Sequence, residues 1–598
     1  MNAPIIYDLS IPDASNHYLE VSARIPVEGA SYLDLTLPVW TPGSYMVRDY
    51  AKHIDDGVTA AGDDGQVLRI FKTDLSKWRV ETSGAKVAVV RYRVYAHDVL
   101  SVCCNWIERD FALINGAATF LTVANSAPRE HIVNVPQQWG EPATALEAIE
   151  PYQFRAANFD ALVDGPITLG VSDRKAFVVD GVSYSLSCIG EEKVWDSGRA
   201  ASDLQRAVHE VHALWGQVPF ERYSFLNVLS ERGGGGLEHA SSSTLITSRW
   251  STRNHNAHLD WLHLATHELI HAWNVKRLRP VELGPFDYSR ATMTDGLWIA
   301  EGFTSYYDKL LVRRSGLSTD SEFLGRLSDM LAAVQNAPGA KVQSLCESSR
   351  EAWIKHYHPG ENSKNTGISY YDKGVIIALL LDAEIRSVTA GSRSLDDVMR
   401  FAYTRYAGDV GYSVAQFQAV ASDVAHVDLG PWFARTVHAT DPLPLDEGLA
   451  KLGLRLAPLT PQPSITDRSQ ATTKSTYLGV STRISGHALV VDEVMRNTPA
   501  ARAGLNVGDE IIAIDAYRIT PGDFDTSLSH YLPGDTVSLL VSRHGKVMRL
   551  ENLTFAPRPR FSWVLELDPN ANDTAVKRRE SWLQSASDNA TISVAAGS

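Results

Sequence analysis

Three side chains within five residues carry the types and spacing needed for chemistry at a metal ion: His267, Glu268 and His271. They lie in residues 262–273, whose apolar positions recur at helical spacing and predict a helix. Residues four apart lie on one face of a helix, so the two imidazoles can bind one cation. Glu268 then lies beside them and can accept a proton from a water on that cation. The spacing therefore predicts the zinc site of a metallopeptidase.

Chance is a poor explanation of this motif. With 19 histidines in 598 residues, an accidental match is expected only about 0.03 to 0.04 times per chain. His263, one helical turn earlier, is a rival ligand. Three successive turns extend too far for one ion with ligand bonds of about 2 Å, so only two of the three histidines can share it. We interpret His263 as a structural histidine, or as one that contacts a metal ligand without binding the metal itself.

A zinc site needs a third protein ligand, and Glu301 is the best candidate. It lies in residues 295–313, a second predicted helix with an aromatic and aliphatic stripe, which Gly316 ends. A glutamate among such neighbours is costly to bury unless it is paired or bound to a metal. We therefore expect Glu301 to complete the metal site.

Four motifs occur in order between residues 233 and 374. They are Gly-Gly-Gly-Gly-Leu-Glu-His at 233–239, His-Glu-Leu-Ile-His at 267–271, Trp-Ile-Ala-Glu-Gly at 298–302 and Tyr-Tyr-Asp-Lys-Gly at 370–374. Together they resemble the glycyl aminopeptidase family, a gluzincin group related to thermolysin and aminopeptidase N. The resemblance implies an aminopeptidase that removes a small N-terminal residue, glycine or alanine. It also implies one zinc ion as cofactor, and peptides with a free N-terminus as substrates.

The resemblance assigns further roles to single residues. Gly235 and Gly236 belong to a substrate-binding strand, although a flexible turn is the alternative, and Glu238 at its end is expected to hold the substrate's free amine. Tyr371 is expected to donate a hydrogen bond to the tetrahedral intermediate, with Tyr370 as the weaker candidate.

One position departs from thermolysin. Ser305 stands four residues after the third ligand, where thermolysin has an aspartate that orients a zinc histidine. The orienting carboxylate must therefore come from elsewhere, and the sequence does not identify it.

The length of the chain and the changing pattern of its apolar and polar residues predict a multidomain α+β protein. Residues 1–165 form a β domain, and residues 166–455 form a thermolysin-like, mainly helical catalytic domain. Residues 456–475, rich in Pro, Thr and Ser, are interpreted as a linker. Residues 476–556 are interpreted as a PDZ domain, and residues 557–598 as a polar tail with a short helix near 576–583.

The β prediction depends on alternating apolar and polar residues in short runs, for example at 18–25 and 86–95, and indicates a sandwich or a saddle-shaped sheet. Residues 40–50 interrupt this pattern with an aromatic loop. The loop either borders the active site or is a packed turn, and we favour the packed turn.

The prediction of a mainly helical catalytic domain depends on helical periodicity in the segments that follow its first few strands. The segments with this periodicity are 202–216, 258–274, 295–314, 322–335, 373–388, 394–406 and 413–424. In the thermolysin-like plan, an edge strand lines the cleft and binds the substrate backbone.

The PDZ prediction depends on Tyr-Leu-Gly-Val at 477–480, which resembles a carboxylate-binding loop, and on the Gly-Asp-Glu-Ile turn at 508–511. Such domains bind peptide C-termini by adding a strand to a sheet edge. A degenerate module that serves only as a packing or dimer surface is the alternative. Two rival functions follow from these features: a zinc endopeptidase, and a PDZ-scaffolded peptide-binding protein with a vestigial catalytic domain. The intact ligands and Glu268 argue against the second.

The composition of the chain argues against some classes of binding partner. A net charge of −14 argues against nucleic acid or anionic membrane, and the longest apolar run, at 375–381, is too short to span a membrane. The N-terminus resembles no secretory signal, which favours the cytoplasm, or the periplasm if a leader has been removed. The four cysteines, at 103, 104, 188 and 346, are expected to be reduced thiols. The oligomeric state stays open.

Overall fold

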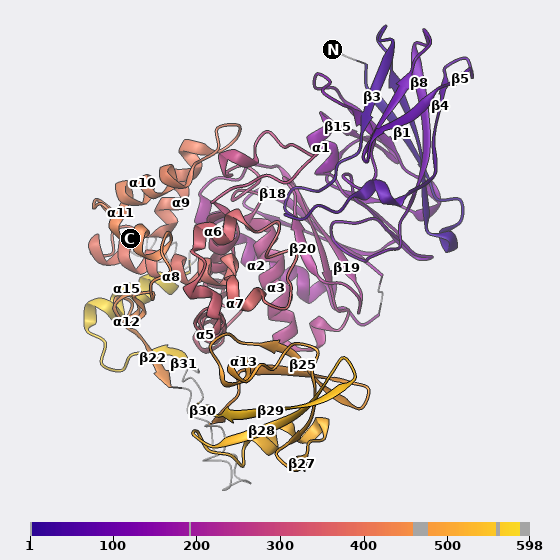
Figure 1. Ribbon diagram of the computed structural model, residues 1–598. Helices are drawn as coiled ribbons and strands as arrows, with labels where there is room; N and C mark the ends of the chain where they lie inside the picture. The colour runs from indigo at the N-terminus through magenta and orange to yellow at the C-terminus, as the bar shows by residue number, and fades with distance from the viewer. Residues whose placement is uncertain (1–2, 191–192, 459–475, 558–562, 586–598) are drawn as a thin grey trace, which may run out of the picture.

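The computed structural model describes residues 3–190, 193–458, 476–557 and 563–585. The β-rich N-terminal domain, the helical catalytic domain and the PDZ domain are distinct in Figure 1, and the predicted multidomain α+β class is confirmed. Residues 459–475 of the predicted linker lie outside the described residues.

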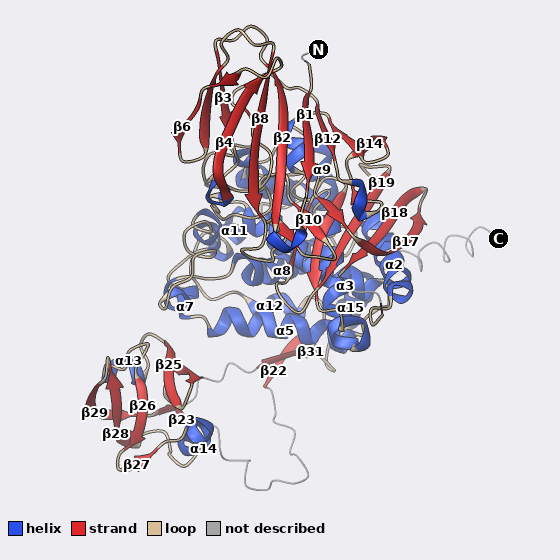
Figure 2. Ribbon diagram, turned by 90° about the vertical axis from the view of Figure 1, so that its right-hand side faces the viewer, coloured by secondary structure: helices blue, strands red, loops and turns tan. Residues whose placement is uncertain are grey.

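The N-terminal domain is built on an eight-stranded sheet. Its strands in spatial order are β14 (Glu147–Glu150), β15 (Gln153–Ala156), β12 (His131–Asn134), β1 (Ile5–Ser10), β2 (Tyr18–Pro26), β8 (Val87–Tyr95), β4 (Ile54–Gly62) and β5 (Val67–Leu68). Every second residue of β2 is buried, because an antiparallel strand with one face on the core alternates its side chains. Two four-stranded sheets complete the domain. Figure 2 shows the strands of this domain in red, above the blue helices of the catalytic domain.

The catalytic domain begins with a five-stranded sheet in the order β17 (Val171–Val179), β18 (Val182–Ile189), β19 (Arg222–Leu229), β21 (Ser242–Thr247), β20 (Gly235–Glu238). Strands β18, β19 and β21 are parallel, and β20 is the antiparallel edge strand. Helix α3 (His255–Ile270) packs against β20 and β21. This packing brings the Gly-rich edge strand and the His-Glu-Leu-Ile-His motif together.

Helices make up the rest of this domain. They include α2 (Ser197–Trp215), α4 (Thr304–Arg314), α5 (Asp320–Asn336), α8 (Tyr370–Val388), α9 (Leu395–Tyr406) and α10 (Val414–Ala425). Two predicted helices differ from the structure. The helix predicted to reach residue 274 ends at Ile270, with His271 at its C-cap. The helix predicted from residue 295 begins as the π-helix η6 (Trp298–Phe303) and continues as α4.

One side chain explains both differences. The amide of Asn274 donates hydrogen bonds to the carbonyl oxygens of Ile299 and Ala300 and to the hydroxyl of Thr304, each at 3.0 Å. A side chain that takes these carbonyls widens the helix locally into a π turn. Helix α3 ends before His271, and the turn that follows places Asn274 next to the carbonyl oxygens of Ile299 and Ala300.

The PDZ domain is an insertion in the catalytic domain. Its sheet contains β24 (Val480–Ser485), β25 (Ala488–Val494), β26 (Glu510–Ile514), β28 (Thr536–Arg543) and β29 (Lys546–Thr554). Before it, β22 (Leu454–Pro458) pairs with β31 (Trp563–Leu567), which follows it.

The prediction of a polar tail is wrong for residues 563–585, which pack against the catalytic domain. Helix α15 (Asp573–Leu583) is longer than the predicted helix and buries Trp582 completely. The indole of Trp582 donates to the hydroxyl of Tyr306, on α4, at 2.7 Å.

The four cysteines are free, as predicted, and three of them are buried. Within the described residues, no helix has the length and apolarity needed to cross a membrane.

Candidate metal centre and peptide-binding site

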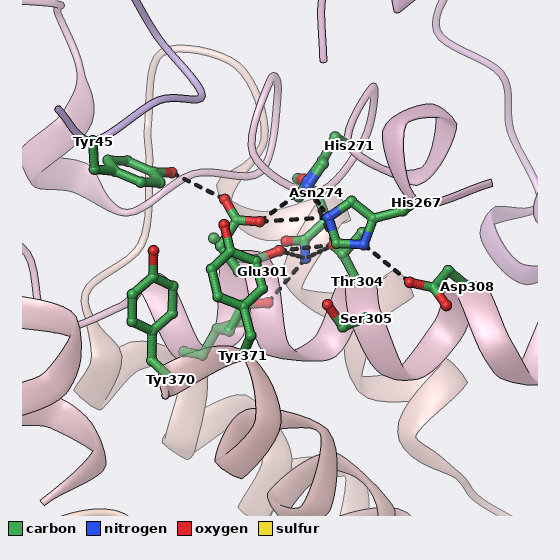
Figure 3. A network of polar contacts seen from close by, with 12 residues as sticks. Tyr45, His267, His271, Asn274, Glu301, Thr304, Ser305, Asp308, Tyr370 and Tyr371 are labelled. Carbon is green, nitrogen blue, oxygen red and sulfur yellow. Dashed lines mark hydrogen bonds and ion pairs between the residues drawn. The ribbon is translucent and has the colours of Figure 1, made fainter. Parts of the chain in front are cut away.

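Three ligand atoms from two helices meet at one point. The Nε2 atoms of His267 and His271 lie 2.9 Å apart, and the Oε2 atom of Glu301 lies 3.5 and 3.2 Å from them. Ligand bonds of about 2.0–2.1 Å in a tetrahedral zinc site place ligand atoms about 3.3 Å apart. Figure 3 shows the three side chains turned toward one another. The spacing fits a zinc ion.

The hydrogen bonds of the two imidazoles also fit a metal. Nδ1 of His267 faces the Asp308 carboxylate at 3.1 Å, and Nδ1 of His271 faces the Asn274 carbonyl oxygen at 2.7 Å. Since both partners are acceptors, each Nδ1 carries a proton, and each Nε2 is the nitrogen that faces the other two ligand atoms. A cation at that point, either a proton or a metal ion, offsets the repulsion between the Nε2 atoms and the carboxylate oxygen.

The pKa shifts indicate the same demand for positive charge. Burial lowers the pKa of His267, but the hydrogen bonds of Asp308 and Glu301 outweigh burial and raise that pKa to about 10. Burial raises the pKa of Glu301, but the two histidines outweigh it and lower that pKa to about 2. The buried site is thus arranged to hold a cation.

Glu268 lies beside the ligands and behind the edge strand. Burial raises the pKa of its carboxyl to about 8, although the neighbouring imidazoles oppose the rise. Strand β20 crosses directly against this carboxylate. A Cβ on Gly236 would fall 2.1 Å from Oε1 of Glu268, so only glycine lets the strand approach this closely. Gly235, with φ of +98°, begins the strand.

Glu238, at the end of β20, is buried without a partner for one oxygen. It is 3% exposed, and its Oε1 has no hydrogen-bond partner among the described residues. Oxygens of Glu238 and Glu268 and a nitrogen of His271 all lie within 4.8 Å of one another. A buried carboxylate oxygen without a donor is costly, so this site favours a cationic ligand such as an ammonium group.

The aromatic loop at residues 40–50 borders this site, which is the interpretation that we did not favour. The hydroxyl of Tyr45 donates to Oε1 of Glu301 at 3.3 Å, and Tyr45 is 1% exposed. Gly43, with φ of +94°, touches the carboxylate of Glu238, since a Cβ there would fall 2.4 Å from Oε2. The loop is therefore a packed turn and also one wall of the site.

Tyr370 and Tyr371 begin helix α8, with Ser369 as the N-cap. Their rings stack at 4.6 Å, and their hydroxyls lie 3.5 and 3.3 Å from the hydroxyl of Tyr357. Both hydroxyls point to the side on which Glu301 lies (Figure 3). Burial, then the charge of Glu301, raises the pKa of Tyr371 well above its ordinary value, so its phenol is a neutral donor. Tyr370 is fully buried, whereas Tyr371 is half-buried and more accessible.

The comparisons with known proteins agree with this architecture. The family model for M61 glycyl aminopeptidase matches residues 260–377, and that for the M61 N-terminal domain matches residues 6–171. The solved structure of an aminopeptidase N family protein from Idiomarina loihiensis is 30% identical, with a TM-score of 0.89 over 97% of this chain and 100% of that one. The chain belongs to the M61 glycyl aminopeptidase family. It is therefore a peptidase, and the resemblance seen in the four motifs is confirmed.

The remaining comparisons add less to this M61 assignment. A PDZ family model matches residues 476–552, which confirms the predicted PDZ domain. An M1 zinc metallopeptidase from Deinococcus radiodurans is 13% identical, with a TM-score of 0.43 over 74% of this chain and 95% of that one. The yeast LTA4 hydrolase is 12% identical, with a TM-score of 0.44 over 75% of this chain and 70% of that one. No curated protein matches the chain.

In this M61 family member, Asp308 is the orienting carboxylate that the sequence did not identify. It lies two helical turns after Glu301, on the same face of the helix, whereas Ser305 lies one turn after it. Burial raises the pKa of Asp308, but Lys309 and His267 outweigh burial and keep it low. His263 lies outside the ligand group, with Nδ1 3.3 Å from the carbonyl oxygen of Asp308. The signal in the sequence was an acidic residue seven positions after Glu301, the candidate third ligand.

Proposed function

We propose that this M61 peptidase is a zinc-dependent aminopeptidase that releases a small N-terminal residue, glycine or alanine. The observation that carries the proposal is the convergence of three metal-ligand atoms beside the buried, unpaired carboxylate of Glu238. His267, His271 and Glu301 would hold one zinc ion. The chemistry that such an ion supplies is Lewis acidity, which polarises a carbonyl and lets water attack at neutral pH.

Glu268 is the general base in this proposal. Its carboxylate accepts a proton from the attacking water and then delivers it to the amine that leaves. Its place beside His271 and against Gly236 supports this role, because the attacking water and the substrate backbone would meet there.

Glu238 and β20 position the substrate. Within the described part of the chain β20 pairs with β21 alone, so its other edge is open to a peptide backbone. A free α-amine, largely charged at neutral pH, would pair with Glu238 and place the bond after the first residue at the metal. Blocked or internal peptides would leave Glu238 unpaired and bind poorly.

Tyr371 stabilises the charge that develops on the carbonyl oxygen. We predict that Tyr371→Phe lowers kcat by about 10²-fold with KM little changed, because the phenol donates more strongly as that charge forms. Steady-state kinetics with alanyl p-nitroanilide measure both constants. An effect confined to KM would assign Tyr371 to substrate packing, and a larger kcat loss in Tyr370→Phe would move the role by one residue.

The PDZ domain suggests a second peptide contact. In the described part of its sheet, β24 pairs with β25 alone, which leaves an edge to which a peptide C-terminus can add.

The proposed function is tested by metal analysis together with a panel of aminoacyl p-nitroanilides. We expect about one zinc per chain, activity that chelation removes and zinc restores, and highest kcat/KM for Gly and Ala. Activity that survives complete removal of metal would refute the zinc assignment. Equal rates for large and small first residues would refute the specificity.

A further inference from the structure

A small hollow lies beside Glu238, between the N-terminal domain and the catalytic domain. Its volume is about 10 Å³. One wall is the loop Trp40, Pro42, Gly43 and Tyr45, and the opposite wall comes from Val275, Lys276, Arg279, Leu283 and Phe286. A space of this size admits about one water molecule, which is close to the size of a methyl group.

We expect the first side chain of a substrate to enter this hollow, on the condition that Glu238 holds the amine as proposed above. The α-carbon is one bond from the amine nitrogen, so the β-carbon lies within about 2.5 Å of that nitrogen. Glu238 itself lines the hollow, so the hollow offers space at about that range. Hydrogen or a methyl group fits there, and a branched side chain does not.

Two aromatic rings fix the size of the hollow. Trp40 meets Phe286 with ring centroids 6.0 Å apart and meets Trp353 at 5.1 Å. The indole of Trp40 also donates to the carbonyl oxygen of Asp287 at 2.8 Å. Trp40 is 1% exposed, so neighbours on every side prevent a change of rotamer that would enlarge the space.

Both cations that line the hollow lie over the ring of Phe286. The ammonium of Lys276, which also pairs with Asp164 at 2.5 Å, lies 5.9 Å from the ring centroid, and the guanidinium of Arg279 lies 5.4 Å from it. Phe286 is half-buried, so its truncation should disturb the fold less than truncation of the buried Trp40.

We propose that Phe286 and Trp40 set the upper size limit for the first residue of the substrate. The N-terminal domain is thus part of the specificity site, and the limit arises from the junction between two domains.

The test is a set of size variants assayed with glycyl, alanyl, valyl and leucyl p-nitroanilides. Phe286→Ala should raise the ratio of kcat/KM for leucine over alanine by about 10-fold or more, the usual effect of one or two methylenes in a closed pocket. Phe286→Trp should shift preference the other way, toward glycine over alanine. Trp40→Phe, which keeps an aromatic ring, should shift it in the same direction as Phe286→Ala.

Phe220→Ala is the matched control. Phe220 is also half-buried, lies 5.3 Å from a tryptophan ring (Trp273) and 6.0 Å from the guanidinium of Arg277, but does not line the hollow. Its leucine to alanine ratio should equal that of the wild type. Zinc content and Tm identify variants that are merely unfolded.

Two results would overturn the inference: an unchanged ratio in a folded, zinc-loaded Phe286→Ala enzyme, or an equal rise in Phe220→Ala. Failure of the aminopeptidase proposal looks different, because the wild type would then cleave neither glycyl nor alanyl substrates.

Discussion

Glu268→Gln is expected to lower kcat by about 10²- to 10⁴-fold while the protein keeps its zinc, because the substitution removes proton transfer and no metal ligand. Glutamine has nearly the same size, so the close contact between Gly236 and this side chain persists. Metal content and turnover should therefore separate in this variant. Elemental analysis and kinetics on the same preparation measure both.

Glu210→Gln provides the control for a buried glutamate outside the site. Glu210 lies on α2, 3% exposed, and contacts Ser585 at 2.6 Å. It should keep both zinc and activity. More than a few per cent of wild-type turnover in Glu268→Gln would remove Glu268 from the mechanism.

Glu301→Ala is expected to abolish activity for a different reason, which is loss of the metal. Only the two Nε2 atoms of His267 and His271 would remain, and two ligands hold zinc far more weakly than three. Removing the carboxylate also removes the negative charge that His267 and His271 stabilise at this site. Competition with a chelating dye measures the zinc affinity.

An alternative third ligand is available for comparison. Glu238 and Glu268 also lie close to His271, within the 4.8 Å of the second potential metal group. If Glu301→Ala binds zinc as tightly as the wild type, one of these carboxylates is the ligand and our assignment is wrong.

The pairing of His267 with His271 as candidate ligands could be predicted from sequence because its geometry is local. His267 and His271 are four residues apart on one helix, and their type and spacing limit the chemistry. Asp308 was missed although it is local, because the known pattern places the orienting carboxylate one turn after the third ligand and here it lies two turns after it.

Contacts between distant segments could not be predicted in this way. Tyr45 meets Glu301 across 256 positions of sequence, and no periodicity records such a contact. Trp582 carried a signal that the prediction of a polar tail did not use: a tryptophan in an otherwise polar helix indicates a face that packs on the core. The pairing of β22 with β31, which makes the PDZ domain an insertion, spans that whole domain and has no local signature.

The most direct test of the aminopeptidase assignment compares one peptide in two forms. A heptapeptide that begins with alanine is incubated with the zinc-loaded enzyme, either with a free amine or with an acetylated one, and the products are identified by mass spectrometry. We expect release of the first residue from the free peptide and no cleavage of the acetylated peptide, because only a charged amine pairs with Glu238. Internal cleavage of both forms at comparable rates would make the enzyme an endopeptidase and Glu238 a structural residue.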